Sequence, residues 1–352
     1  MFNVRKSALS AVLAVVSLCA SAAHSAAQTY TVTDLGTISG NSVSTGYALS
    51  STGAAAGTSS TPTAAIAALF SNGKVTNIST LGSNVSVATA INGSAEIVGW
   101  NFFYSNPNFD PRAFLYSNGH MTSIDSPSVF PSGTEALGIN DSGEVVGTGY
   151  FTDGNFHAFL YSGGKMTDLG PRGAVQASAI AINNSGQIIG GYYLASGAVG
   201  EFLITNGTMT TLPVPTGSYA VSAFAINDIG EIVGSDFFSS GAPPHAVKFS
   251  GGAWTDLGAI SGAEASRATG INLSGQVVGT GFFRQTSYHP FKPGKHVPFI
   301  ATSGGLVDLN TLIQTGTGFT LTDAIGINGS GHILCNATNA AGFKHAVLLS
   351  PK

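Results

Sequence analysis

The sequence is poor in charged residues. Asp, Glu, Lys and Arg make up only 9% of the 352 residues, whereas about a quarter is usual in soluble proteins. Lys and Arg together number 13, and the formal net charge is −4. Nucleic-acid binding needs clustered basic residues that displace counterions from phosphates. The composition therefore argues against a nucleic-acid partner and predicts a neutral, polar surface.

Cysteine is almost absent: the chain contains two, and one of them, Cys19, lies in the first 27 residues. Residues 1–27 have the pattern of a secretory signal peptide, in which two basic residues precede an apolar stretch, Ala8–Ala20, that is too short to span a bilayer. Small residues allow cleavage after Ala22 or after Ala27. We expect an exported protein, extracellular or periplasmic, without a membrane-spanning helix. Removal of the signal leaves Cys335 alone, so no intramolecular disulfide can form.

One short segment recurs along the chain. GINDSGEVVG, from Gly138 to Gly147, is followed or preceded by similar segments at intervals of about 42 to 56 residues. The other copies are AINGSAEIVG, AINNSGQIIG, AINDIGEIVG, GINLSGQVVG and GINGSGHILC, with a degenerate copy, ALSSTGAAAG, around Leu49. A repeat of this length indicates a solenoid or a β-propeller.

Each copy is followed by a second half-motif, such as HAFLYSGGKMTDLG from His157. One repeat thus contains four short runs, which we name strands A (EALGIN), B (EVVG), C (HAFLY) and D (KMTDL). Glycine occurs in both the A–B turn (N-x-x-G) and the C–D turn (S-[GN]-G). Four strands in about 40–50 residues are typical of a β-propeller blade.

The two ends of the chain complement each other. The last repeat stops after a C strand, His345–Ser350, while residues 28–352 begin with an isolated D strand, Tyr30–Gly36. An N-terminal strand that completes the last blade closes a propeller and leaves no open edge. The sequence therefore predicts an all-β fold, a single seven-bladed β-propeller over residues 28–352.

The repeats resemble those of the bacterial extracellular HAF family. The name-giving triplet is present as His157-Ala158-Phe159, the A-x-x-I-N-x-x-G-x-I-V-G half and the M-T-D-L-G tail also match, and the resemblance covers essentially all of residues 28–352. It implies a secreted bacterial protein. Several repeats depart from the triplet, with Arg112 or Gly200 in place of His and Val247 or Val347 in place of Phe, which argues against a role for a complete ring of histidines.

The A–B turns contain acidic residues beside glycines, as metal or phosphate loops do. Calcium requires six to eight oxygens from regularly spaced carboxylates, but the position of Asp141 is Gly93, Asn184 or Leu273 in other repeats. A phosphate loop would need G-x-x-x-x-G-K-[ST], which is missing. We expect turn chemistry, in which Asn140 makes Asx-type hydrogen bonds and Gly143 is left-handed.

Histidines precede or begin several C strands, namely His157, His245, His296 and His345. A metal ion needs imidazoles that converge on one point, and equivalent positions on different blades lie far apart. We expect packing or capping roles, and the sequence predicts no metal and no cofactor.

Aromatic pairs follow strand B in five repeats, and neighbouring residues of a strand point to opposite sides. One ring of each pair is expected to pack, and the other to form an exposed rim suited to sugars or to another protein. We assign the rim to Phe103, Phe151, Tyr193, Phe238 and Phe283.

The B–C loop of the sixth repeat differs from the rest. Residues 281–296 contain aromatic and cationic side chains suited to an anionic glycan or a protein partner. Besides Phe283, the candidate ligand-binding residues are Arg284, Tyr288, His289, Lys292 and Lys295. An ordered flap with solvated charges is the alternative.

Charged residues precede the small residue of strand A in three repeats. These are Glu135, Arg267 and Asp323, expected near the mouth of the channel. Two carboxylates and an arginine could act on a carbohydrate by acid–base chemistry. Pairing of Arg267 with Asp323, which leaves Glu135 alone and solvated, is the simpler expectation.

The sequence therefore favours a secreted, monomeric binding module without catalytic residues, which binds its ligand, with glycans as the first candidates, on the face that carries the B–C loops. The alternatives are a cell-surface structural or adhesive protein that contacts other proteins, and a carbohydrate-active hydrolase or lyase that uses Glu135 with Asp323.

Overall fold

The computed structural model describes residues 28–352 apart from positions 40, 62–63, 80, 84, 103–109, 171–173 and 284–293. The expected signal peptide (1–27), together with Phe103, Arg284, Tyr288, His289 and Lys292, lies outside the described residues. Within the described part, the protein is all-β apart from one 3₁₀ turn, η1 (Leu309–Thr311). It contains no helix that is long and apolar enough to cross a membrane.

The strands form antiparallel sheets in which sequence neighbours pair. Four sheets take their four strands from one continuous segment each: β10 (Thr134–Ile139), β11 (Val145–Tyr150), β12 (Phe156–Ser162) and β13 (Lys165–Asp168); β14 (Ala174–Ile182), β15 (Ile188–Leu194), β16 (Val199–Thr205) and β17 (Thr208–Thr211); β18 (Ser218–Ile226), β19 (Ile232–Phe238), β20 (His245–Ser250) and β21 (Ala253–Gly258); β22 (Ala265–Ile271), β23 (Val277–Phe282), β24 (His296–Thr302) and β25 (Gly305–Asp308). A fifth has β26 (Phe319–Ile327), β27 (Ile333–Asn339), β28 (Lys344–Pro351) and β1 (Tyr30–Asp34).

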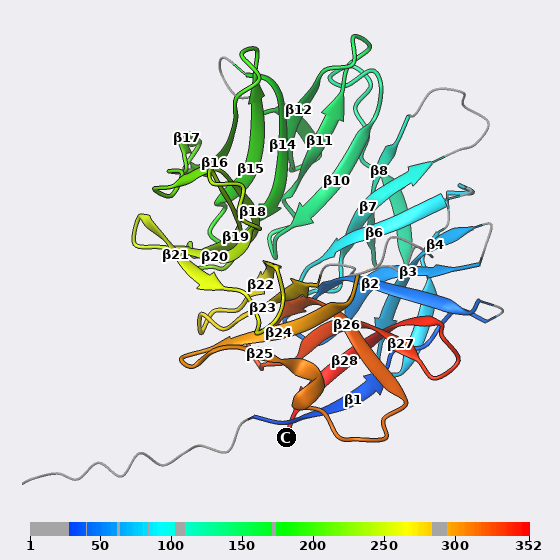
Figure 1. The fold of residues 1–352 in the computed structure, drawn as a ribbon. Coiled ribbons are helices and arrows are strands. Elements are labelled where there is room, and N and C mark those ends of the chain that lie inside the picture. Colours follow the sequence, from blue (N-terminus) through cyan, green and yellow to red (C-terminus); the bar gives the residue numbers. More distant parts are fainter. Residues whose placement is uncertain are drawn as a thin grey trace, which may run out of the picture.

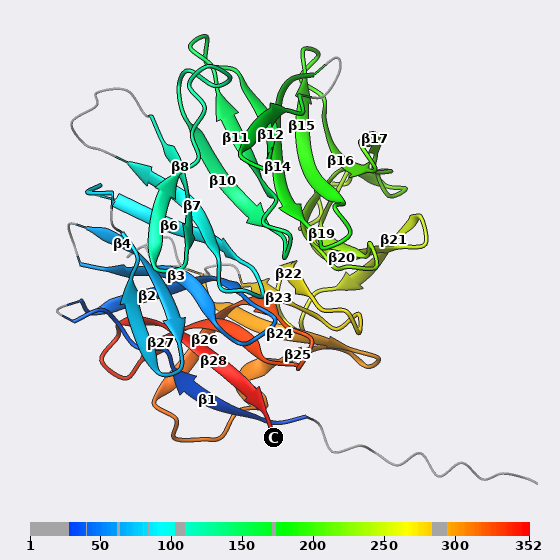
Figure 2. The same ribbon diagram turned by 180° about the vertical axis from the view of Figure 1, so that it is seen from behind.

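The sixth sheet has eight strands and consists of two such sets. They are β2 (Val43–Leu49), β3 (Ala55–Ser60), β4 (Ala65–Ser71) and β5 (Lys74–Asn77), then β6 (Val85–Ile91), β7 (Ile97–Phe102), β8 (Arg112–Ser117) and β9 (His120–Ser123). One parallel pair, Ala65 with Val85, joins the two sets. We call each set of four strands a unit. Figures 1 and 2 show the units arranged around a central axis, as in a β-propeller.

The turns have the expected conformations. Asn140 Oδ1 accepts hydrogen bonds from the backbone N–H groups of Ser142 and Glu144, at 3.1 and 3.0 Å, and Gly143 has φ +75°. These contacts confirm the expected turn chemistry. In the C–D turn, Gly163 and Gly164 both have positive φ, as the type I′ turns of tight hairpins require.

Neighbouring units are joined by buried amides at the A–B turns. The turn Asn donates a hydrogen bond from Nδ2 to the backbone carbonyl of the next unit's equivalent residue, at 2.8 to 3.3 Å. The successive pairs are Asn92–Asn140, Asn140–Asn183, Asn183–Asn227, Asn227–Asn272, Asn272–Asn328 and Asn328–Ser50. The last pair connects the C-terminal unit to the N-terminal one, and the Ala65–Val85 pair joins the N-terminal unit to the next, so the units form a closed ring.

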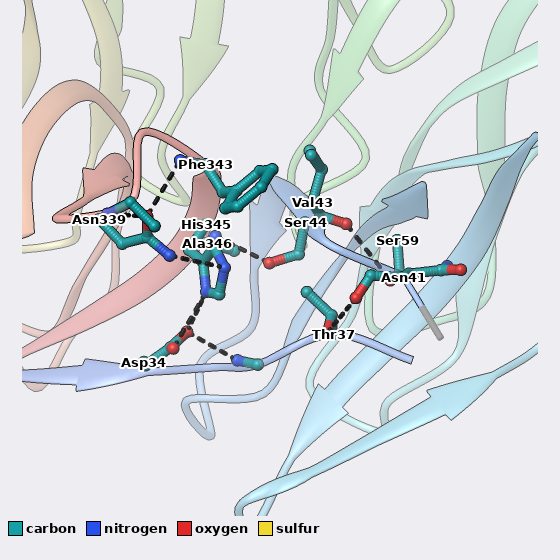
Figure 3. Close-up of polar contacts among 12 residues, drawn as sticks. Asp34, Thr37, Asn41, Val43, Ser44, Ser59, Asn339, Phe343, His345 and Ala346 are labelled. Atoms are coloured by element: carbon teal, nitrogen blue, oxygen red, sulfur yellow. Dashed lines mark hydrogen bonds and ion pairs between the residues drawn. The ribbon is translucent and has the colours of Figure 1, made fainter. Parts of the chain in front are cut away.

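The chain termini close the ring at the outer edge as well. β1 pairs with β28 from Tyr30 opposite Pro351 to Asp34 opposite Val347, which confirms the expected pairing of the N-terminal strand with the last strand. Figure 3 shows the adjoining contacts, in which the backbone N–H of Ala346 donates to Ser44 Oγ of β2 at 3.1 Å.

The core lies between the units. Phe159 and Met166 of one unit, for example, pack with Val98 and Ala113 of the preceding unit. Close approach within a unit depends on the glycine of strand B, because a Cβ on Gly147 would lie 1.9 Å from the carbonyl oxygen of Glu135.

Candidate functional site

Each strand A contains a register shift that turns an extra residue toward the central channel. In β10 the shift lies between Ala136 and Gly138, and Leu137 lines a cavity of about 350 Å³. Ile180 and Phe224 of the next two units line the same cavity. The channel therefore has an apolar wall. Residues of the A–B turns border the cavity at one end, and the B–C loops lie at the opposite ends of the strands.

At the B–C end, five side chains from three units form a continuous series, which we call the Arg267 cluster: Phe224, Arg267, Phe282, His296 and Asp323. The Arg267 guanidinium carbon lies 5.5 Å from the ring centroids of both Phe224 and Phe282. Phe282 contacts the His296 ring edge-on at 4.9 Å, and His296 Nδ1 lies 3.1 Å from Asp323 Oδ1.

This cluster corrects two expectations. Asp323 pairs with His296, and the ion pairs of the described residues include none between Arg267 and Asp323. His296 is also not at the position of His157, because β24 places Val297 opposite Gly281 where β12 places His157 opposite Gly149. The shift by one residue turns His296 toward the neighbouring unit.

A second group lies on the two preceding units and consists of Glu135, Tyr150, Phe156 and Tyr193; we call it the Tyr150 cluster. The Tyr150 hydroxyl donates to Glu135 Oε2 at 3.1 Å. The Phe156 ring lies 6.2 Å from the Tyr150 ring and 6.4 Å from the Tyr193 ring. The expectation that Glu135 is alone and solvated was therefore wrong: burial raises the pKa of its carboxyl, and the Tyr150 hydrogen bond partly offsets this effect.

In three described pairs, Tyr150–Phe151, Phe237–Phe238 and Phe282–Phe283, the second ring packs, although it was expected to form the exposed rim. Phe151 contacts Phe130 and His157 edge-on at 5.3 and 4.8 Å, and Phe238 contacts His245 at 5.0 Å. Phe283 joins the core between its unit and the preceding one, with Lys295 Nζ 5.5 Å from its ring centroid.

Tyr193 is the exception among the assigned rim residues. It lies opposite Val199 as Tyr150 lies opposite Phe156, so it is equivalent to the first ring of the pair, and 49% of its surface is exposed. Counting three residues from the strand-B glycine (Gly147 to Tyr150, Gly190 to Tyr193) would have given this register from the sequence. The sequence analysis also missed Tyr219, which is 65% exposed with its ring 6.2 Å from that of Phe237.

Three of the four histidines contact an aspartate of strand D, which agrees with the expected packing or capping roles. Nδ1 of His157 lies 2.9 Å from Asp168 of strand D, and His245 and His345 make equivalent contacts with Asp256 and Asp34. Where Arg112 replaces the histidine, it pairs with Asp110 and with Asp125. In the part of the chain that the structure describes, no group of three His, Cys, Asp or Glu side chains could hold a metal ion.

No family model matches the chain, and no curated protein matches its sequence. Solved structures share the fold. The β-propeller domain of the Trilobed protease from Pyrococcus furiosus, described as having an open velcro topology, superposes with a TM-score of 0.56 at 10% identity, over 90% of this chain and 96% of that one.

Two peptidase structures are also similar. A prolyl endopeptidase gives a TM-score of 0.56 at 11% identity over 89% of this chain, and a puromycin-hydrolyzing peptidase from Mycobacterium tuberculosis gives 0.53 at 9% over 91%. The chain spans about half the length of each. At such low identity the similarity establishes the β-propeller fold alone.

Proposed function

We propose that the protein is a non-catalytic β-propeller binding module that recognises glycans at the B–C end of its channel. The observation that supports this most strongly is the pair of aromatic clusters at that end. Tyr150, Phe156 and Tyr193 form a series of rings across two units, and the Arg267 guanidinium contacts two further rings. Aromatic faces contribute a large contact area at low entropic cost and can stack on the apolar faces of sugars.

The charges at the channel mouth also favour binding. Glu135 is hydrogen-bonded to Tyr150, and Asp323 is paired with His296 on a different unit. Two carboxylates that already have partners serve better to fix the rings in place than to exchange protons with a substrate.

A glycan array followed by calorimetry tests the proposal. The purified protein should bind at least one saccharide, and Tyr193→Ala should weaken binding about tenfold, the equivalent of about 1.4 kcal/mol of lost stacking. Leu273→Ala is the matched control, because Leu273 is exposed on an A–B turn at the opposite end of the channel. Failure to bind any saccharide, or equal losses in both variants, would contradict the proposal.

We further propose that the fold has seven blades, the eight-stranded sheet counting as two, and that the chain is a monomer of the extracellular HAF-repeat type. The ring of turn asparagines with Ser50 supports the blade number. A signal peptide at residues 1–27 and export to the periplasm or the medium complete the proposal. Cell fractionation with N-terminal sequencing tests the export and the cleavage site, and light scattering tests the monomer.

A further inference from the structure

Arg267 is the one charge of the Arg267 cluster that lacks a polar partner among the described residues. Its guanidinium is in contact with two aromatic rings, whereas the described residues provide no carboxylate or carbonyl oxygen to accept its hydrogen bonds. Asp323 of the adjacent unit is engaged by His296 and by the Thr322 hydroxyl. A guanidinium has five N–H donors in a fixed fork and no acceptor, so those of Arg267 can donate to a ligand.

The two rings hold the guanidinium in place. Phe224 comes from the channel wall of the preceding unit, and Phe282 comes from the strand paired with that of Arg267. Both ring centroids lie 5.5 Å from the guanidinium carbon, so the planar group is stabilised by two cation–π contacts. Binding through such a preorganised side chain loses little conformational entropy.

We propose that Arg267 selects a carboxylate-bearing saccharide, with its guanidinium binding the uronate carboxylate through two parallel hydrogen bonds. This inference rests on the proposed function and specifies its ligand class. A planar carboxylate matches the fork of the guanidinium, and the adjacent rings of Phe224 and Phe282 offer apolar surface to the sugar. Lys295, at the start of the segment that leads into β24, adds a second positive charge on the same unit.

The test compares polyuronates with their neutral counterparts. Binding of polygalacturonate, alginate and hyaluronan is measured by calorimetry beside the carboxyl-reduced form of each polymer, with the wild-type protein and three variants. The wild type should bind at least one polyuronate at least tenfold more tightly than its reduced form, and added NaCl should weaken that binding. Arg267→Gln should lose the preference, and Arg267→Lys should retain only part of it, because lysine keeps the charge without the fork.

Tyr193→Ala separates this inference from the proposed function, because it should weaken the binding of charged and of neutral polysaccharides equally. Tight binding of neutral chains, or a polyuronate preference that survives in Arg267→Gln, would overturn the inference and leave the proposed function intact. Failure to bind any saccharide would overturn both. Arg267 is exposed, so both Arg267 variants should fold, and Arg267→Gln should lose only a little thermal stability with the two cation–π contacts. A large loss of thermal stability would assign the residue a structural role instead.

Discussion

His345 and Asp34 are 311 residues apart in the sequence, and Nδ1 of the imidazole lies 3.0 Å from each carboxylate oxygen (Figure 3). The pair joins the last strand C to the N-terminal strand D. His157 and Asp168 make the same contact at 2.9 Å within one continuous hairpin. The ring is therefore closed by a contact that two other units, those of His157 and His245, make internally.

A double-mutant cycle should measure this closure. Alanine at Asp34, at His345 and at both should give a coupling energy of about 0.5–1 kcal/mol, since both groups are partly exposed. The same cycle on His157 and Asp168 is the matched control and should give a similar value. Asp34→Ala should also speed amide hydrogen exchange in β1. Zero coupling at His345–Asp34 alone would show that main-chain pairing suffices to hold β1.

Gly147→Ala should destabilise the protein by about 3 kcal/mol or more, because the added Cβ would lie 1.9 Å from the Glu135 carbonyl oxygen and force the strands apart. Gly329→Ala is the control, because its Cβ would meet nothing within 4 Å and its φ is not left-handed. Urea unfolding should show that Gly329→Ala changes stability by less than about 1 kcal/mol. Equal effects would contradict the crowding argument.

Asn183→Ala should lower the free energy of unfolding by about 2–4 kcal/mol. The buried amide donates to Asn227 O and Gln187 Oε1 and accepts from the backbone N–H groups of Ser185 and Gln187, and each bond contributes about 1 kcal/mol. The reciprocal change, Ser50→Asn, should stabilise by about 1 kcal/mol because it supplies the amide that this unit lacks. Chemical denaturation measures the free energy of unfolding of both variants. Destabilisation by Ser50→Asn would contradict the expectation that the hydrogen bonds between the turn amides stabilise the protein.

Glu201 should make stability depend on pH. It takes the place of Ala158 in the repeat, is 8% exposed, and its Oε2 has no hydrogen-bond partner. Burial raises the pKa of this carboxyl to about 8, and a backbone hydrogen bond from Ala223 partly offsets the effect. A folded-state pKa above the unfolded value favours the protonated form, so stability is highest below about pH 4.5 and falls as pH rises to about 8.

Glu201→Gln isolates this contribution. The variant cannot ionise, so its free energy of unfolding relative to the wild type should rise by several kcal/mol between pH 5 and pH 8 and then level off. Asp153→Asn, at a fully exposed site, should show no such rise. Parallel curves for wild type and Glu201→Gln would mean that water reaches the Glu201 carboxyl.

The repeat made most of the fold predictable. Glycine and Asn positions determined the turns, and the incomplete repeats at the two ends predicted the pairing of β1 with β28. The blade number and the family resemblance remain proposals, because similarity to solved structures at such low identity establishes only the type of fold.

The site was less predictable, because contacts between units depend on register shifts of one residue. The shift that brings His296 to Asp323 does not show in an alignment of similar letters. Phe224 contacts Arg267 only because a bulge turns it toward the channel. Composition marks such residues as aromatic or charged, but only packing determines which of them lie together.

Gln28 and Lys352 also lie together, with the Gln28 side-chain amide donating to the Lys352 carbonyl at 3.0 Å. Both adjoin the C–D turn end of their strands, on the face opposite the B–C loops. A tether attached beside Gln28 or Lys352 would therefore hold the molecule by the face opposite the B–C loops, with Arg267 and Tyr193 directed away from the support. Immobilised through a terminal tag, the protein should present its candidate binding surface freely to long polymers in solution.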